Sequence, residues 1–544
     1  MTGRRNVLWI MCDQLRFDYL GCAGHPHIRT PNIDRLAARG VRFTNTYVQS
    51  PICGPSRMSF YTGRYVHSHG STWNGIPLRA GEPTLGDHLR AEGVRTVLVG
   101  KTHMKADVEG MMRLGIDPDT EIGVRISECG FEPFERDDGL HPYGPYDPDP
   151  RYDTYLRETG YEGENLWEEW ANSAEDADGK ILSGWLLSHA DKPARIEEPD
   201  SETPYMTDRA IEFMRAAKAD GRPWCLHLSY IKPHWPYIAP APYHDMYGKA
   251  DVVPPVRSEE ERRDPHPVFG SYMRERVSLA FSRDEVRDHV IPAYMGLITQ
   301  IDDHVGRLVD FLEEEGLAED TLIVFTADHG DYLGDHWLGE KELFHEQSVK
   351  IPLIVVDPSS AADATRGTTS DALVEAIDLA PTFLDYFGGE AKPHVLEGRS
   401  LMPLLHGAAV GDWRGAAISE CDYAMRKART DHGQTVADSR MFMVFDGRWK
   451  FVFAEGFRPM LFDLEADPQE LRDLGADPAF AAERERLEDM LFSWSRRLHA
   501  RITVSDAAIA NRAGGELRSG ILIGYWDEDE VERARREQGP GDAL

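Results

Sequence analysis

The chain has 544 residues, of which 41% are hydrophobic and 10% aromatic, so it can bury a large core and is long enough for two domains. Its formal net charge of −33 argues against nucleic acid as a partner, because a polyanion repels another polyanion. The six cysteines are scattered without a CxxC pair, and no segment approaches the length of a membrane span. These features predict a cytoplasmic protein without disulfides and without a membrane partner.

Five short apolar runs predict buried strands of a parallel sheet. They are residues 7–11, 95–99, 224–228, 322–326 and 353–356. Helical patterns lie between these runs, at residues 30–40, from Thr207 onward and at residues 293–314. Strands that alternate with helices predict an α/β fold with a large, mostly parallel sheet sandwiched by helices.

The pattern changes after residue 403. We expect an α/β domain over residues 1–403 with an irregular insertion at 106–200, a smaller α+β domain over 404–510, and a tail over 511–544. Residues 448–453 and 460–464 predict antiparallel strands, and residues 481–499 predict an amphipathic helix. The apolar face of that helix consists of Leu487, Met490, Leu491, Trp494 and Leu498. The apolar run 520–526 in the tail predicts docking on a second copy of the chain or on its own domain.

The segment Cys53-Gly-Pro-Ser-Arg57 places a thiol, a proline and a fixed cation within five residues. Proline is favoured in the first turn of a helix, so residues 56–62 are predicted to form a helix whose N-terminus faces Cys53. Helix N-termini attract anions and stabilise thiolates. The segment therefore predicts a nucleophile beside an anion-binding site, although by itself it also fits a buried structural cysteine in a loop.

Polar residues follow four of the predicted strands. They are Asp13 and Gln14, Lys101 and His103, His234, and Asp328 and His329. Ligands of open α/β sheets bind beyond the carboxyl ends of the strands, so we expect these residues to lie close together at that edge of the sheet. Asp13, Gln14, Asp328 and His329 offer a mostly oxygen site for one divalent cation, and the imidazole favours Mn²⁺ over Ca²⁺. Together with Cys53, Arg57 and Lys341, this set fits attack on a tetrahedral oxyanion ester.

Several motifs, in their order along the chain, resemble those of one enzyme family. They are Cys53-x-Pro-x-Arg57 with Thr62-Gly-Arg64, Gly100-Lys-x-His103, Pro233-His-x-Pro236, Thr326-Ala-Asp-His-Gly330, Lys341, and Leu461-Phe-Asp-Leu464 with Asp467-Pro-x-Glu470. They cover most of the chain, which resembles the type I sulfatases and phosphonate monoester hydrolases of the alkaline phosphatase superfamily. The resemblance implies an alkaline-phosphatase-like fold and a small anionic ester as substrate.

The resemblance also implies the chemistry of the site. Cys53 would be converted to formylglycine by a formylglycine-generating enzyme, and the hydrated aldehyde would attack sulfur or phosphorus. The metal ligands implied are Asp13, Gln14, the group at position 53, Asp328 and His329. Arg57 and Lys101 would steady the diol and His103 would take its proton. His234 and Lys341 would grip the transferred group and assist the leaving oxygen, and Asn74 would bind substrate.

The motifs resemble two branches of the family and do not decide between them. Gln14, His329 and Asn74 resemble the phosphonate monoester hydrolases, whereas Lys101 and His103 resemble the sulfatases. We therefore expect hydrolysis of sulfate monoesters through a covalent sulfo-enzyme intermediate, with phosphonate monoesters and phosphate diesters as the alternative substrates. A non-catalytic binder is disfavoured because the full set of site residues is present. A plain thiol enzyme is disfavoured because carboxylates without a metal hinder thiolate formation.

Overall fold

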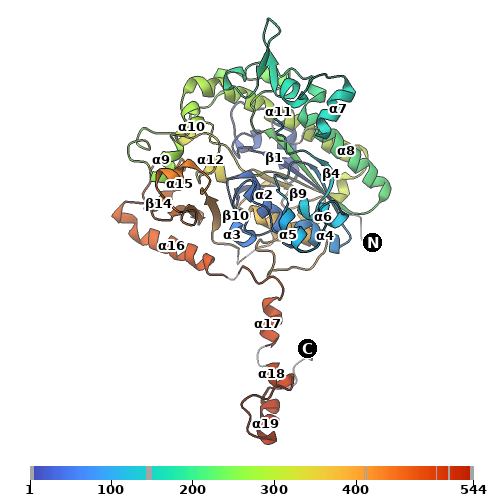
Figure 1. Cartoon of the computed structure of the whole chain (residues 1–544), viewed down its shortest axis with the longest axis vertical. Coiled ribbons are helices and arrows are strands. Elements are labelled where there is room, and N and C mark those ends of the chain that lie inside the picture. Colours follow the sequence, from blue (N-terminus) through green and yellow to red (C-terminus); the bar gives the residue numbers. More distant parts are fainter. Residues whose placement is uncertain are drawn as a thin grey trace.

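A computed structural model describes residues 5–142, 150–409, 411, 413–497, 499–512 and 515–538. Figure 1 shows a large body, a smaller sheet beside it, and an arm formed by the last three helices. The body contains an eight-stranded sheet in the order β10-β2-β9-β8-β1-β7-β3-β4. Its strands are β1 (Asn6–Asp13), β2 (Val41–Tyr47), β3 (Arg95–Gly100), β4 (Glu132–Arg136), β7 (Trp224–Pro233), β8 (Thr321–Ala327), β9 (Leu353–Val356) and β10 (Thr368–Glu375).

All five predicted strands are present, but the prediction that all five are parallel is wrong for β9. This strand pairs antiparallel with both β8 and β2, whereas the other pairs in the sheet are parallel. The chain leaves β8 at Ala327 and re-enters the sheet at Leu353 without a helical crossover to the opposite edge. An apolar run of four residues carries no information about strand direction. The mostly parallel sheet is confirmed.

Helices cover both faces of the sheet. His227 and Tyr230 lie three positions apart on β7 and therefore point to opposite faces. His227 stacks on Trp9, which also contacts Phe60 of α2 (Cys53–Thr62) and a phenylalanine of α13 (Leu379–Tyr386). Tyr230 instead hydrogen-bonds Thr207 of α8 (Glu202–Asp220). The predicted sandwich is thus confirmed.

The remaining predicted helices differ from the structure mainly at their starts. Residues 30–40 form α1 (Pro31–Arg39), as expected. α8 begins five residues before Thr207, and α11 (Asp284–Glu314) begins nine residues before the predicted start and continues through Pro292. The helix α4 (Leu85–Ala91), which packs against β3, was not predicted.

The insertion at 106–200 contains more regular structure than expected. It holds α5 (Val108–Arg113), α6 (Glu121–Ser127), strand β4, α7 (Arg151–Thr159), a π-helical turn (Trp167–Ala171) and the hairpin of β5 (Ser173–Glu175) and β6 (Ile181–Ser183). The prediction of little regular structure is wrong because these elements are too short for a periodic pattern to reveal them. Strand β4 also joins the edge of the main sheet beside β3.

The C-terminal sheet is antiparallel, as predicted. Its strands are β11 (Ala417–Asp422), β12 (Arg440–Phe445), β13 (Trp449–Ala454) and β14 (Met460–Asp463). Helix α16 (Ala481–Ser495) packs on this sheet through buried Leu487, Leu491 and Trp494, and Met490 is partly buried there. Leu498, also predicted on this face, lies outside the described residues.

The other described α-helices are short, apart from α19 in the arm. They are α3 (Val66–His69), α9 (Pro267–Tyr272), α10 (Arg276–Phe281), α12 (Glu346–Val349), α14 (Met402–Leu405), α15 (Lys427–Asp431), α17 (Asp506–Arg512), α18 (Gly515–Arg518) and α19 (Glu528–Gln538). Among the described parts of the chain, none of the helices has the length and apolar composition needed to cross a bilayer.

A buried ion cluster fastens the C-terminal sheet to the body. The ammonium group of Lys450 on β13 is fully buried, 2.8 Å from Oε1 of Glu346 and 2.7 Å from Oε1 of Glu470. It also donates a 3.0 Å hydrogen bond to the carbonyl of Phe344. These contacts hold the segment that follows Lys341, so the small sheet supports one side of the strand-end region.

We predict that Lys450→Ala lowers the free energy of unfolding by about 3–5 kcal/mol, because it leaves buried Glu470 without a counter-charge and leaves Glu346 with Lys350 alone. Urea unfolding at neutral pH measures the effect. The control is Lys427→Ala, which removes an exposed pair with Asp431 and should cost less than about 0.5 kcal/mol. A loss below about 1 kcal/mol for Lys450→Ala would contradict the proposed fastening.

Candidate active site

Seven of the residues singled out in the sequence lie at the carboxyl ends of four neighbouring parallel strands, β8, β1, β7 and β3: Asp13, Gln14, Lys101, His103, His234, Asp328 and His329. The structure brings part of that set into direct proximity. Asp13, Cys53, Asp328 and His329 are buried, and each offers a potential ligand atom within 4.8 Å of the others. Nε2 of His329 lies 3.0 Å from Sγ of Cys53, 3.8 Å from Oδ1 of Asp13 and 3.7 Å from Oδ1 of Asp328. Two carboxylates and an imidazole around one point are a donor set that fits a divalent cation.

Cys53 is the first residue of α2, which begins three residues earlier than predicted and contains Pro55 in its first turn. The group at position 53 therefore lies at a helix N-terminus, where the helix dipole favours negative charge. Asn74 packs against the same turn, and its Oδ1 accepts a 2.8 Å hydrogen bond from the backbone N–H of Gly54. In this structure Asn74 thus contacts the backbone beside Cys53.

Arg57 connects α2 to the two buried carboxylates. Its Nε donates to Oδ2 of Asp328 at 2.8 Å, and its Nη2 lies 3.3 Å from Oδ2 of Asp13. Its Nη1 donates to the carbonyl of Lys101 and to the hydroxyl of Ser229. Burial would lower the pKa of Arg57, but the two carboxylates outweigh burial and raise it. Arg57 therefore stays charged and balances part of the negative charge of the site.

Lys101 and His103 reach the site from the end of β3. The ammonium of Lys101 is buried, 2.5 Å from Oδ2 of Asp13. Gly100 precedes it with φ of 105°, and a Cβ there would lie 2.0 Å from the carbonyl oxygen of Ser229, so only glycine allows this approach of β3 to β7. His103 is half-buried, and its backbone N–H donates to Oδ1 of Asp138 at 3.1 Å.

Lys341, His234 and Gln14 form a second contact group at the same edge. The ammonium of Lys341 donates to Oε1 of Gln14 at 2.8 Å and lies 3.3 Å from Nε2 of His234. Nδ1 of His234 is 2.7 Å from the carbonyl of Trp235, so the ring donates there and its Nε2 accepts from Lys341. The backbone N–H of Gln14 donates to Oδ1 of Asp328 at 3.0 Å, which joins this group to the ligand cluster.

The surrounding cations control the ionisation of the site. Burial alone raises the pKa of the Cys53 thiol, but Lys341 and His329 outweigh burial and hold that pKa well below its usual value. Burial and the neighbouring thiolate raise the pKa of Asp13, yet Lys101 and other nearby cations bring it below its usual range. Burial lowers the pKa of His234. These shifts favour the anionic forms of Asp13 and Cys53 and the neutral form of His234.

Four residues that contact the site were not singled out in the sequence: Ser229, Asp138, Tyr237 and Asp331. Asp331 could have been recognised, because it is the second acid after the end of β8, three residues beyond Asp328. Ser229 and Tyr237 lie within and just after β7, where nothing in their sequence context distinguishes them from structural residues. Asp138 follows β4, a strand that the sequence pattern did not reveal.

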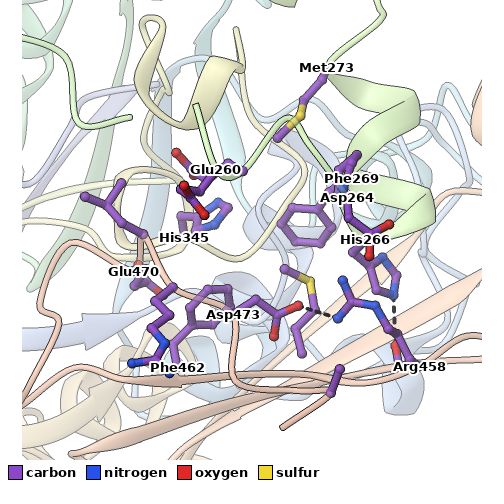
Figure 2. A pocket seen from close by; sticks show the side chains of 16 residues that line it. Glu260, Asp264, His266, Phe269, Met273, His345, Arg458, Phe462, Glu470 and Asp473 are labelled. Carbon is purple, nitrogen blue, oxygen red and sulfur yellow. Dashed lines mark hydrogen bonds and ion pairs between the residues drawn. The ribbon is translucent and has the colours of Figure 1, made fainter. Parts of the chain in front are cut away.

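A separate cavity of about 290 Å³ lies between the segment around α9, His345 and strand β14. Figure 2 shows His266, Arg458 and Asp473 along its wall, with Arg458 paired to Asp473. Near this cavity, Glu261, His336 and His345 form a second group of potential metal ligands. The rings of His336 and His345 are stacked with 3.7 Å between centroids and 3° between planes. Their lone pairs therefore lie in two separate parallel planes, which does not suit joint binding of one ion.

Comparison with known proteins gives a consistent result. A model described as Sulfatase matches residues 5–389, and one described as N-sulphoglucosamine sulphohydrolase, C-terminal, matches residues 334–497. The multifunctional alkaline phosphatase superfamily protein PehA of Trinickia caryophylli is 33% identical over 92% of this chain and 97% of its own length. The choline-sulfatase of Rhizobium meliloti is 28% identical over 98% of this chain and 95% of its own length.

Solved structures of high similarity point to the same family as the sequence comparisons. The phosphonate monoester hydrolase of Silicibacter pomeroyi has a TM-score of 0.80 and 32% identity, covering 93% of this chain and 98% of its own. The corresponding enzyme of Agrobacterium radiobacter has a TM-score of 0.77 and 28% identity, covering 90% of this chain and 95% of its own. The chain therefore belongs to the sulfatase family, in the branch of the alkaline phosphatase superfamily that includes the phosphonate monoester hydrolases.

Proposed function

We propose that this protein, an ester hydrolase of the sulfatase family, cleaves small sulfate monoesters at the strand-end site through a covalent sulfo-enzyme intermediate. The observation that carries the proposal is the position of Cys53, at a helix N-terminus and within 4.8 Å of potential ligand atoms of Asp13, Asp328 and His329. In the proposal a formylglycine-generating enzyme converts Cys53 to formylglycine, whose hydrated aldehyde supplies the attacking oxygen.

A divalent ion, Mn²⁺ or Ca²⁺, would supply positive charge to that oxygen and to the ester when bound. The residues proposed to hold it are Asp13, Gln14, the group at position 53, Asp328 and His329. Two buried carboxylates fit this purpose, and the imidazole of His329 favours Mn²⁺ over Ca²⁺.

The other residues bind the ester and move protons. Arg57 and Lys101 hold Asp13 in place and balance its charge, and His103 is proposed to take the proton of the diol. In the contact group of Lys341, His234 and Gln14, the positive charge lies on Lys341, because burial keeps the neighbouring His234 neutral. This pair is proposed to grip the transferred group and to assist the leaving oxygen. Asn74, beside the nucleophile, is proposed to contact substrate.

A second candidate function is hydrolysis of phosphonate monoesters or phosphate diesters at the same site. It is supported by the similarity to two solved phosphonate monoester hydrolases and to a relative described as multifunctional, and by Gln14 and His329 at two of the proposed ligand positions. Lys101 and His103 support sulfate instead, and the structure places Lys101 directly on Asp13.

The tail supports a proposal on assembly. Ile523 and Trp526 have 86% and 88% of their surfaces exposed, in an arm that leaves the body (Figure 1). We propose that this apolar segment docks on a second copy of the chain, since an isolated arm would leave large apolar side chains in water. The cytoplasmic location and the domain boundaries at 403 and 510 stay predictions.

We predict an aldehyde at position 53 in protein isolated from its natural host. Peptide mass analysis should find formylglycine in place of the thiol, and a hydrazide probe should label the wild-type protein but not Cys53→Ala. An intact thiol in fully active protein would contradict the proposed nucleophile.

We predict that metal-stripped protein binds one Mn²⁺ per chain, measured by isothermal titration calorimetry. Asp328→Asn should weaken the affinity by at least about 10-fold, because it removes a buried charged ligand. Glu261→Gln, in the second cluster, is the matched control and should change neither affinity nor stoichiometry. Equal affinity for Asp328→Asn and wild type would contradict the assigned site.

We predict that an aryl sulfate is turned over faster than an aryl phosphonate monoester and a phosphate diester with the same leaving group. Cys53→Ala should lower all three rates by at least about 10³-fold, since the nucleophile is shared. Steady-state kinetics on metal-loaded enzyme measures the ranking. A sulfate rate far below the other two would replace the lead proposal by the second candidate.

A further inference from the structure

The mechanism above leaves one buried carboxylate at the site unused. Asp331 lies two residues after His329 and is fully buried. Its Oδ1 accepts from the backbone N–H of Leu333 at 3.0 Å, and its Oδ2 accepts from the hydroxyl of Tyr237 at 2.6 Å and from Nε2 of Gln14. Within the described part of the chain, no basic side chain forms an ion pair with it. A buried carboxylate held only by neutral donors is costly, which indicates a purpose beyond stability.

The contacts of Gln14 define that purpose. The ammonium of Lys341 has only donors, so the atom of Gln14 that faces it at 2.8 Å must be the amide oxygen. The amide nitrogen must then face the opposite way, toward Asp331 and the hydroxyl of Tyr237. An ionised carboxylate only accepts hydrogen bonds, so it requires the same orientation. The amide is therefore fixed from both ends.

We propose that Asp331 is a positioning residue: it holds the amide of Gln14 so that an oxygen, and not a nitrogen, faces Lys341 and fixes the Lys341 ammonium beside His234. The inference rests on the proposed function. The same orientation offers an oxygen, the atom that a hard cation prefers, from a residue expected to hold the ion.

Exchanging the amide of Gln14 and the carboxylate of Asp331 between the two positions tests the proposal. Asp331→Asn has the same shape but must turn its NH₂ either toward Leu333 N–H or toward the NH₂ of Gln14, and both are donors. Gln14→Glu places a second carboxylate against Asp331. The double variant Gln14→Glu/Asp331→Asn exchanges amide and carboxylate at constant charge, and the new NH₂ at position 331 can donate to the new carboxylate at position 14. That carboxylate still accepts from Lys341.

We expect kcat/KM to fall about 10- to 100-fold in each single variant, as for loss of a hydrogen bond to a charged group. The double variant should recover at least about 10-fold over either single variant, a coupling that independent damage does not produce. Tyr237→Phe is the matched control: it removes one donor to Asp331 and one 3.3 Å acceptor of the Gln14 amide, but Asp331 and Lys341 still fix the amide orientation, so its loss should stay below about 5-fold. Thermal unfolding checks that each variant is folded.

Two results would overturn the proposal: Asp331→Asn within about 3-fold of wild type, or a double variant whose loss equals the product of the two single losses. If Asp331→Asn fails to fold, the comparison of Gln14→Glu with the double variant decides. Wild-type turnover is measured first, and its absence with every ester counts against the proposed function alone. Mn²⁺ titration of the same proteins then decides on Asp331, with affinity expected to fall about 10-fold in Asp331→Asn and to return in the double variant.

Discussion

The arrangement of the site depends on two carboxylates, Asp13 and Asp328, that are buried at the ends of adjacent strands. Two such charges cannot remain in a water-free interior unless cations face them. Arg57 contacts both carboxylates and also binds the carbonyl of Lys101, so one side chain joins α2, β1, β3 and β8. The helix that presents Cys53 is thereby fixed to the sheet by the charges that the chemistry uses.

The segment between β8 and β9 contains Asp331 and Lys341, two of the residues that contact the site. Because the chain turns back into the sheet at the edge where it left, Asp331 and Lys341 stay at that edge. Glu346, a few residues further on, is held by Lys450 of the C-terminal sheet. The small sheet thus supports the loop that contains Lys341, and the antiparallel direction of β9 is a consequence of the same return.

The location of the cations resolves the apparent conflict between a formal charge of −33 and an anionic ester as the proposed substrate. Lys101, Lys341 and Arg57 are buried at the strand-end site, where Lys101 and Arg57 contact Asp13 and Lys341 contacts Gln14. Local charge in a low-dielectric site acts much more strongly on a bound group than exposed charges screened by solvent. The acidic surface is therefore compatible with an anion site, provided that the cations are inside.

The sequence alone determined the five predicted strands, the helix after Cys53 and the strand-end residues, because apolar runs, a first-turn proline and polar residues at strand ends are local patterns. Only the tertiary structure decided the direction of β9, the strand β4 within the insertion, and the contacts of Gln14 with Asp331 and Lys341. Strand direction depends on where the chain re-enters the sheet, and hydrogen-bond partners more than 300 residues apart depend on how strands are ordered in space. Neither is encoded in the local spacing of residues.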